Sequence, residues 1–347
     1  MRLQNALVLI AALGCNKKDP DKAERPAHTE KPSAPAPAKP GPKTGKDLAA
    51  HYLDCVGLAN AGKWDDVKAR CVAATFTSHL MDGPEIKGVD MLVEWGKNTK
   101  AAFPDIKTEP QLVIVDGRSI LAVELTTGTH QGALKTPQGE LPATNKKLGL
   151  LFFHKLAIDD DNKMTEEWAY KDARTFLGQL GTEVGPVRAP VDKGWDGAPI
   201  VVVAADDAAS KANVETVQKM IAALNAHKAA DTVALVTDDV VESDQAEDKD
   251  RNKAEMVQGA DEFGKAFPDG KLDVPAYFAA GDYVVAPGKL TGTNDGPLGP
   301  MKATHKKIAS EYAEVYRLKG GKIAAIWRFR NGMATAQQLG LVPEPKK

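Results

Sequence analysis

The sequence has little cysteine, no excess of charge and no hydrophobic run long enough to cross a bilayer. Its three cysteines, Cys15, Cys55 and Cys71, are too few for a disulfide scaffold and lack the close paired spacing of a zinc site. With 45 Lys and Arg residues against 47 Asp and Glu residues, the net charge is -2. This balance removes the general electrostatic argument for a nucleic-acid partner.

Sequence motifs with a known chemistry are also missing. The chain contains no Walker loop, no dinucleotide-binding G-x-G-x-x-G, no hydrolase G-x-S-x-G and no metalloprotease H-E-x-x-H. The aspartate clusters at 159–161 and 238–239 lack the spacing of a calcium loop and are better explained as turns. We therefore predict neither a metal site nor a cofactor.

The composition is that of a folded protein. Hydrophobic residues make up 43% of the chain and charged residues 27%, close to the values of ordinary globular proteins. A length of 347 residues suggests two domains rather than one, since a domain has about 150 residues.

The N-terminal segment carries a targeting pattern. Arg2 precedes an apolar run at 6–13, which is followed by Gly14 and Cys15. This order resembles a bacterial lipoprotein signal, and the resemblance implies cleavage before Cys15 and lipidation of that residue. Residues 16–46 are rich in Pro, Ala and Lys and lack apolar periodicity, which predicts a disordered tether. We expect a membrane-anchored protein of the cell envelope; an ordinary signal peptide or a buried apolar start is the alternative.

Two long segments, 47–181 and 212–342, share landmarks in the same order. The paired landmarks are Phe103-Pro104-Asp105 with Phe267-Pro268-Asp269, Thr127-Gly128-Thr129 with Thr291-Gly292-Thr293, Trp168 with Trp327, and Gln179-Leu180-Gly181 with Gln338-Leu339-Gly340. Duplication of one unit is the simplest explanation. We predict two domains joined by a linker at 182–211 and followed by a tail at 343–347. Within the linker, the apolar residues at 200–203 favour either a simple connection or an added edge strand.

Each segment changes from helical to extended periodicity. In the first segment the helical patterns cover 47–61, 65–74 and 89–102. Runs rich in Val, Ile, Leu, Phe and Thr follow at 111–115, 120–127, 148–158 and 164–170, separated by turn residues. Helices followed by consecutive strands predict an α+β unit with an antiparallel sheet.

The ordered motifs of the first segment carry a family resemblance. They are Phe103 to Asp105, Gly128-Thr129-His130-Gln131-Gly132, Glu166 to Trp168, Asp172 and Gln179 to Gly181. This set resembles the SnoaL-like polyketide cyclase or ester cyclase family of the nuclear-transport-factor-2-like superfamily. The resemblance implies two tandem conical α+β barrels, each with helices packed on a curved sheet around a pocket. Because this fold hosts cyclases, isomerases, dehydratases and binding modules, it does not by itself establish an activity.

The resemblance also implies candidate site residues. Asp172 matches the aspartate that serves as general acid/base beside a substrate carbonyl, without metal or organic cofactor. Period-2 geometry places Trp168, Tyr170 and Asp172 on one face of a strand. His130 is the second catalytic candidate, and the predicted ligand-binding residues are Trp168, Tyr170, His154, His79, Trp327 and Asn331. The structural alternatives are that Asp172 only caps the following helix and that the histidines are satisfied core residues.

The second segment lacks most of these titratable groups. Its aligned residues are Asn331 for Asp172, Asn294 for His130, Glu314 for His154 and Ser243 for His79. Because asparagine cannot act as a general base, we predict that this segment is a binding or packing module. Members of the superfamily pair sheet against sheet, so we expect the two segments to form that pair within one chain.

Two questions remain open from the sequence. Cys55 and Cys71, on adjacent predicted helices, either form a disulfide or remain buried thiols. The function is either non-catalytic binding of a small apolar or carbonyl-containing ligand, or cyclase or isomerase activity through Asp172.

Overall fold

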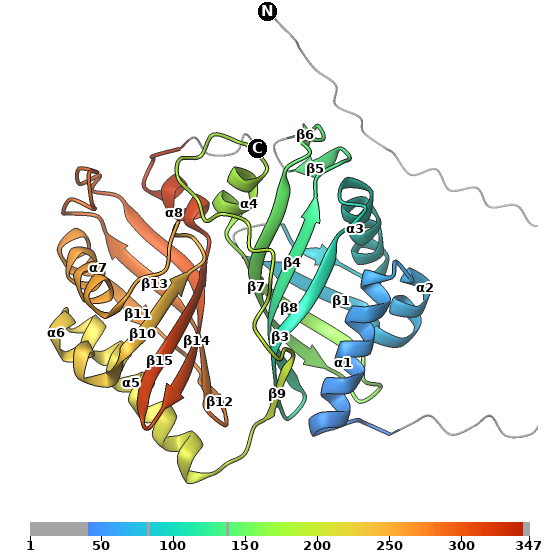
Figure 1. Cartoon of the computed structure of the whole chain (residues 1–347), viewed down its shortest axis with the longest axis horizontal. Helices are drawn as coiled ribbons and strands as arrows, with labels where there is room; N and C mark the ends of the chain where they lie inside the picture. The colour runs from blue at the N-terminus through green and yellow to red at the C-terminus, as the bar shows by residue number, and fades with distance from the viewer. Residues whose placement is uncertain (1–40, 82–83, 137–138, 343–347) are drawn as a thin grey trace, which may run out of the picture. The chain divides into compact units, whose positions relative to one another are not determined.

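The computed structural model describes residues 41–81, 84–136 and 139–342 (Figure 1). The predicted lipidation site, Cys15, and most of the predicted tether lie outside the described residues. Within the described ranges, no helix combines the length and the apolar character needed to cross a membrane. We call residues 47–181 repeat 1 and residues 212–342 repeat 2.

Repeat 1 begins with helices and continues into a seven-stranded sheet. The helical elements are α1 (Gly45–Asn60), α2 (Trp64–Asp66), the π-helical turn η1 (Val67–Cys71), α3 (Val89–Ala102) and α4 (Ala173–Gln179). Its strands in this sheet are β1 (Val72–Leu80), β2 (Ile86–Lys87), β3 (Lys107–Asp116), β4 (Ser119–Thr129), β7 (Lys147–Ile158) and β8 (Met164–Tyr170). The seventh strand, β9 (Ile200–Val203), comes from the linker. A separate pair is formed by β5 (Leu134–Thr136) and β6 (Gly139–Leu141).

The order of strands in this sheet is β2-β1-β8-β7-β4-β3-β9. Two of the pairings are parallel, β1 with β8 and β9 with β3, so the prediction of an antiparallel sheet is wrong in this respect. The predicted helix at 65–74 ends at Cys71, and β1 follows it directly. Strand β1 is rich in Thr and β-branched residues, but its partner β8 lies far along the chain, so no local pattern indicated the pairing. The linker residues at 200–203 form strand β9.

Repeat 2 has a similar succession of elements, although its described residues include no strand that corresponds to β2, β5 or β6. Its helical elements are α5 (Ala208–Asn225), α6 (Ala229–Thr232), the 3-10 turn η2 (Val233–Leu235), α7 (Lys253–Ala266) and α8 (Gly332–Gln338). Its strands are β10 (Val236–Asp244), β11 (Lys271–Asp273), β12 (Phe278–Ala280), β13 (Tyr283–Thr293), β14 (Lys307–Lys319) and β15 (Lys322–Arg330), paired in the order β10-β15-β14-β13-β11, with β12 added to β13.

Matching hydrogen bonds support the duplication. The carboxylate of Asp105 accepts from the backbone N–H and the hydroxyl of Thr129, at 2.7 and 2.8 Å. Asp269 accepts the same two bonds from Thr293, at 2.5 and 2.8 Å. The FPD and TGT landmarks recur because, in each repeat, the aspartate that follows a helix (α3 or α7) holds the end of a strand (β4 or β13).

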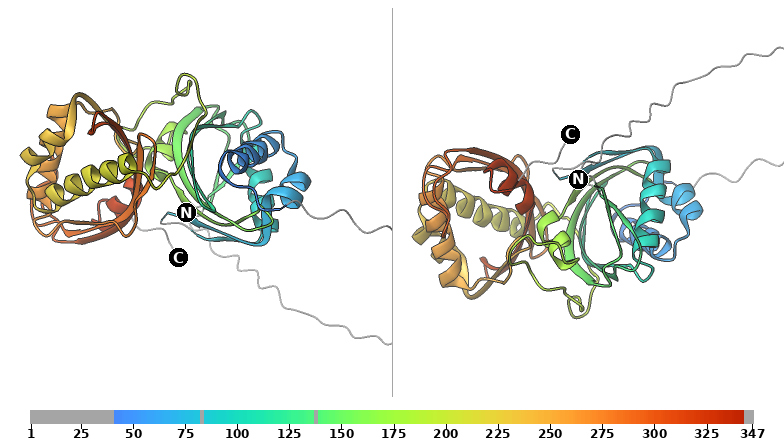
Figure 2. Two further views of the ribbon diagram at one scale, coloured as in Figure 1. Left: turned by 90° about the horizontal axis from the view of Figure 1, so that it is seen from below. Right: turned by 90° about the horizontal axis from the view of Figure 1, so that it is seen from above.

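Each curved sheet has two different faces (Figure 2). We call the face that packs against the helices of its own repeat the inner face, and the opposite one the outer face. In repeat 1, Leu48 and Tyr52 of α1 pack on Val113, Ile120 and Leu156 of the inner face. We call the space between the inner face and the helices cone 1, and its counterpart in repeat 2 cone 2.

The outer faces of the two sheets share one apolar cluster. In it, the rings of Phe153 in repeat 1 and Phe329 in repeat 2 are 5.8 Å apart. Residues from both repeats are fully buried there, among them Ile114, Val123 and Val315. Burying these side chains stabilises each repeat through its neighbour, since a fully buried Val, Ile or Phe contributes about 1.5–3 kcal/mol.

The open question about the cysteines is answered by a disulfide. Cys55 of α1 is bonded to Cys71 of η1, with a Cα–Cα distance of 5.7 Å. The bond ties the first helix to the start of β1 at the base of cone 1.

Candidate functional site

Four polar side chains lie side by side on the inner face of repeat 1. They come from the neighbouring strands β1, β8, β7 and β4, and a tyrosine of α1 extends the series. We call this set the polar row: Ser78, Glu167, His154, Glu124 and Tyr52. The strand register explains the alignment, because Ser78 is the direct partner of Glu167, while His154 is diagonal to both Glu167 and Glu124.

The polar row is connected by short contacts. Ser78 Oγ donates to Glu167 Oε2, and His154 Nδ1 lies 2.8 Å from Glu167 Oε1. On its other side, His154 Nε2 is 3.8 Å from Glu124 Oε2, which is too long for a hydrogen bond. The Tyr52 hydroxyl donates to Glu124 Oε1 at 2.6 Å. The imidazole therefore stands between two carboxylates and is hydrogen-bonded to only one of them.

The two carboxylates have opposite pKa shifts. Burial raises the pKa of Glu124, and the neighbouring His154 and Tyr52 only partly offset this effect. Burial also acts to raise the pKa of Glu167, but the hydrogen bond and the charge of His154 prevail and lower it. A pair of carboxyl groups with diverging pKa values is the arrangement that lets one act as an acid while the other stays ionised.

The pKa of His154 is raised by its two acidic neighbours. Burial acts to lower its pKa, but the hydrogen bond and charge of Glu167, together with the charge of Glu124, raise it overall. The His154 side chain keeps 20% of its surface exposed and that of Glu167 keeps 16%, whereas Glu124 keeps 6%. Part of the His154 side chain on the inner face is therefore exposed, whereas Glu124 is almost completely covered.

An aromatic environment adjoins the polar row. The ammonium of Lys171, just beyond β8, lies 5.9 Å from the ring centroids of Trp95 and Phe152 and 5.7 Å from that of Phe176. These rings come from α3, β7 and α4, so three elements enclose the lysine. Apolar rings beside a few polar groups are typical of small-molecule sites.

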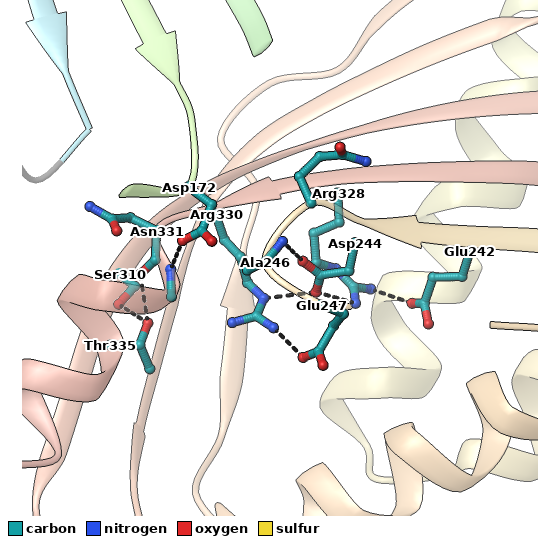
Figure 3. Close-up of polar contacts among 12 residues, drawn as sticks. Asp172, Glu242, Asp244, Ala246, Glu247, Ser310, Arg328, Arg330, Asn331 and Thr335 are labelled. Carbon is teal, nitrogen blue, oxygen red and sulfur yellow. Dashed lines mark hydrogen bonds and ion pairs between the residues drawn. The ribbon is translucent and has the colours of Figure 1, made fainter. Parts of the chain in front are cut away.

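The structure places the predicted general base elsewhere. Asp172 is fully buried and is the N-cap of α4, where it accepts from Arg174 N at 3.3 Å and Thr175 N at 2.7 Å. Its Oδ1 also accepts from Gly332 N of repeat 2 at 2.8 Å (Figure 3). With both oxygens used by backbone groups, Asp172 acts as a cap and as a link between repeats, and it is not part of the polar row.

Three predicted ligand-binding residues lie on the outer face rather than in cone 1. Trp168 and Tyr170 alternate with Glu167 along β8, so they face the other way, toward the apolar cluster shared with repeat 2. His79 stacks on Trp168 with ring centroids 5.4 Å apart and contacts Glu166 at 2.8 Å. Trp168 and Tyr170 share a face, but this face packs against repeat 2 and does not line the cone. His154, by contrast, lies on the inner face.

His130 lies in the packed interior of repeat 1, outside the polar row. It is fully buried, stacks on Phe103 at 5.0 Å and has its Nδ1 3.1 Å from the Thr144 hydroxyl. Burial lowers its pKa. In repeat 2, Asn294 occupies the aligned position and accepts from the hydroxyl of Thr304 at 3.0 Å. Both residues tie the end of one strand to the start of the next, a role that needs no proton transfer.

The inner face of repeat 2 carries ion pairs instead of a polar row (Figure 3). Arg328 contacts Glu314 at 2.6 Å, Glu242 at 2.9 Å and Asp244 at 3.6 Å. Arg330 contacts Asp244 at 2.7 Å and Glu247 at 2.6 Å. We call these six residues the ion network. Glu314, aligned with His154, is only 1% exposed and is neutralised by Arg328.

The remaining predicted residues of repeat 2 lie outside cone 2. Asn331 is the N-cap of α8, accepting from Ala334 N, and it donates to Met81 O of repeat 1 at 3.4 Å. Trp327 stacks on Trp195 of the linker, with centroids 4.5 Å apart. These two tryptophans line a cavity of about 420 Å³ on the outer face of repeat 2.

Sequence reasoning missed most of the polar row. Glu124 interrupts the apolar run at 120–125, and a charged residue in such a strand was an available signal of a buried functional group. Glu167 was overlooked because it alternates with Trp168, the residue that carried the family motif. Ser78 lies on β1, which was not predicted as a strand, and Tyr52 lies within the predicted helix at 47–61. Among the described residues, no three His, Cys, Asp or Glu side chains are grouped to hold a metal ion.

The solved structures that resemble this chain are proteins that match over about the length of one repeat. AclR from Streptomyces galilaeus is 25% identical, covering 40% of this chain and 87% of its own, with a TM-score of 0.37. TsrD from Streptomyces laurentii is 18% identical over 39% of this chain and 98% of its own, with a TM-score of 0.35. IdmH from Streptomyces antibioticus is 20% identical over 37% and 98%, with a TM-score of 0.33. No curated protein matches the chain.

The family comparison covers both repeats. The family model described as SnoaL-like polyketide cyclase matches residues 46–180 and again residues 214–339. These two ranges coincide with the two sheets and their helices and include every residue of the polar row. The chain therefore belongs to the SnoaL-like polyketide cyclase family, with two copies of its domain in tandem.

Proposed function

We propose that repeat 1 binds a small carbonyl compound in cone 1 and moves a proton next to its carbonyl group, with His154 as general base. The observation that carries this proposal is the hydrogen bond of 2.8 Å between His154 and Glu167 on the inner face of the sheet. A base that is oriented by a carboxylate and partly exposed meets the minimum requirement for general base catalysis.

The proposed step uses the two ring nitrogens differently. We assign the proton of neutral His154 to Nδ1, which then donates to Glu167. The free Nε2 takes a proton from the carbon beside the substrate carbonyl, and the C–H electron pair becomes the enolate. Glu167, the carboxylate with the lowered pKa, stabilises the imidazolium that forms. Glu124, whose pKa is raised by burial, donates a hydrogen bond or a proton to the enolate oxygen.

This assignment moves the family's acid/base role from Asp172 to His154. Two observations favour this assignment. Asp172 is completely buried, and its two carboxylate oxygens already accept three backbone hydrogen bonds. A carboxylate in that position stabilises the fold and has no free lone pair directed at a ligand.

The test is exchange of hydrogen for deuterium beside the carbonyl group, followed by NMR on a panel of enolisable ketones and β-keto esters. We expect the wild-type protein to catalyse exchange and His154→Gln to lower the rate by about 100-fold or more. The matched control is His79→Gln, which removes an imidazole paired with a glutamate on the outer face, and it should retain the rate.

Binding without catalysis is the other candidate function, and the same panel separates it. If wild-type protein retains a compound in native mass spectrometry but catalyses no exchange, the general-base proposal is wrong and cone 1 is a binding site. Equal rates for His154→Gln and wild type contradict the role of His154 directly.

We also propose that the protein acts in the cell envelope, anchored through a lipid on Cys15. The Cys55–Cys71 disulfide supports this location, because such bonds persist in oxidising compartments and are rare in the cytosol. In membrane fractionation, the wild-type protein should sediment with membranes and Cys15→Ala should not. Recovery of both proteins in the same fraction contradicts the anchor.

A further inference from the structure

Lys171 is the one residue next to the polar row whose chemistry the proposed function leaves unused. It follows the last residue of β8 and lies on the same side of the strand as Glu167, by the period of two. The side chain is half-buried, and its Nζ is enclosed by three aromatic rings at 5.7–5.9 Å. One of those rings, Trp95, is 46% exposed, so the lysine lies close to the protein surface.

The lysine is not neutralised as its counterpart in repeat 2 is. Aligned on Trp168 and Trp327, the residue equivalent to Lys171 is Arg330, which contacts two carboxylates. Leu80 is the strand partner of Ala169 just as Asp244 is the partner of Arg328, so repeat 1 has a leucine where repeat 2 has an acidic residue. Among the described residues, no carboxylate lies within 4.0 Å of Lys171 Nζ.

Burial makes the Lys171 ammonium easier to deprotonate than a lysine in water. Burial lowers the pKa of Lys171, and the charge of Glu167 opposes this only in part. Lysines placed among apolar groups are the ones that serve as nucleophiles toward carbonyl carbon, because a desolvated ammonium loses its proton more readily.

We propose that Lys171 forms an imine with an aldehyde or ketone held in cone 1. This inference rests on the proposed function, which puts a carbonyl compound in that cone. The neutral Nζ attacks the carbonyl carbon, a C–N bond forms and the carbonyl oxygen takes a proton to give a carbinolamine. Loss of water from the carbinolamine, with the oxygen leaving after a second protonation, gives the iminium ion. The iminium acidifies the adjacent C–H, whose proton passes to His154, and hydrolysis later returns the amine and the carbonyl product.

The test is reductive trapping with benzaldehyde and butanal as probes and cyanoborohydride as the reductant, followed by peptide mapping. We expect Lys171 to be labelled at least ten times faster than Lys155. Lys155 is the matched control because its Nζ also lies over aromatic rings, at 4.3 Å from Trp168 and 5.4 Å from Phe278, but on the outer face. Lys171→Arg should remove the fast adduct, and Lys155→Arg should leave it.

Labelling of Lys171 at the same rate as Lys155 in the wild-type protein overturns the inference, and this comparison needs no variant to fold. Exchange that depends on His154 without fast labelling of Lys171 refutes the imine and leaves the proposed function standing. Fast labelling of Lys171 without any exchange beside the carbonyl supports the imine and counts against the general base.

Discussion

Cone 1 and cone 2 are built from corresponding helices and strands but differ in the polar side chains that they contain. In cone 1 a histidine stands between two carboxylates with diverging pKa values, and part of its surface remains exposed. In cone 2 the aligned glutamate, Glu314, is buried and paired with Arg328. The difference teaches that duplication can leave one copy free for chemistry while the other becomes a packing partner. The shared apolar cluster then makes the second copy a support for the first.

The ion network predicts the largest effect on stability. Arg328 contacts three buried carboxylates, so Arg328→Met should lower the free energy of unfolding by about 3–5 kcal/mol, since uncompensated charges would remain buried. In cone 1, Lys171→Met should cost at most about 1 kcal/mol, because only cation–π contacts are lost. Urea denaturation of both variants measures the contrast. Equal losses would show that the two cones do not differ in this way.

The disulfide predicts an effect confined to repeat 1. The double substitution Cys55→Ala and Cys71→Ala should lower the free energy of unfolding by about 3 kcal/mol, the value for a loop of this length. Addition of a thiol reductant should destabilise the wild type to a similar extent and leave the double variant unchanged. A wild-type protein insensitive to reductant in urea denaturation would contradict the structural role of the bond.

The two helix caps predict a smaller and graded effect. Asp172→Ala should lower the free energy of unfolding by about 2 kcal/mol, because Asp172 caps α4 and also accepts from Gly332 of repeat 2. Asn331→Ala, which removes the cap of α8, should cost about 1 kcal/mol. The folded Asp172→Asn protein should keep its rate of proton exchange. Loss of exchange in a stable Asp172→Asn protein would return the base to Asp172.

The pH dependence of stability should differ between wild type and His154→Gln. Because the pKa of His154 is raised in the folded state, its contribution is complete below pH 6.5, the ordinary value of histidine, and is lost as pH rises through the folded pKa. Glu124, also raised, acts in the same direction at its own titration. Urea denaturation at a series of pH values should show the wild-type advantage shrinking as pH rises from 6 to 9. An advantage that grows over this range has the wrong sign.

The sequence was sufficient to predict the two-repeat architecture, but it predicted only part of the candidate site. Recurrent landmarks such as FPD and TGT predicted two copies, and periodicity predicted most helices and strands, because both are local patterns. Strand β1 and its parallel pairing with β8 escaped, since that pairing joins residues far apart in the chain. The polar row depends on the same non-local register, so Ser78 and Glu167 gave no local sign of meeting.

The alternation of side chains along β8 explains why Trp168 and Tyr170 were assigned to the wrong face of the sheet. Trp168 and Tyr170 were correctly grouped, but period 2 does not say which of two faces is the inner one. The outer face of this sheet is also buried, by the second repeat, so apolar character marked both faces equally. In the same way, the alternation of His154 with Leu150, Phe152 and Leu156 shows that the four share a face but not that this face is the inner one.

The central claim is that proton chemistry resides in cone 1 and not in cone 2. The most direct measurement compares deuterium exchange by His154→Gln with exchange by Glu314→Gln, which put the same uncharged residue at aligned positions of the two repeats. Our account predicts a loss of about 100-fold or more for the first and a rate within about twofold of wild type for folded Glu314→Gln. Equal rates in the two variants would contradict it.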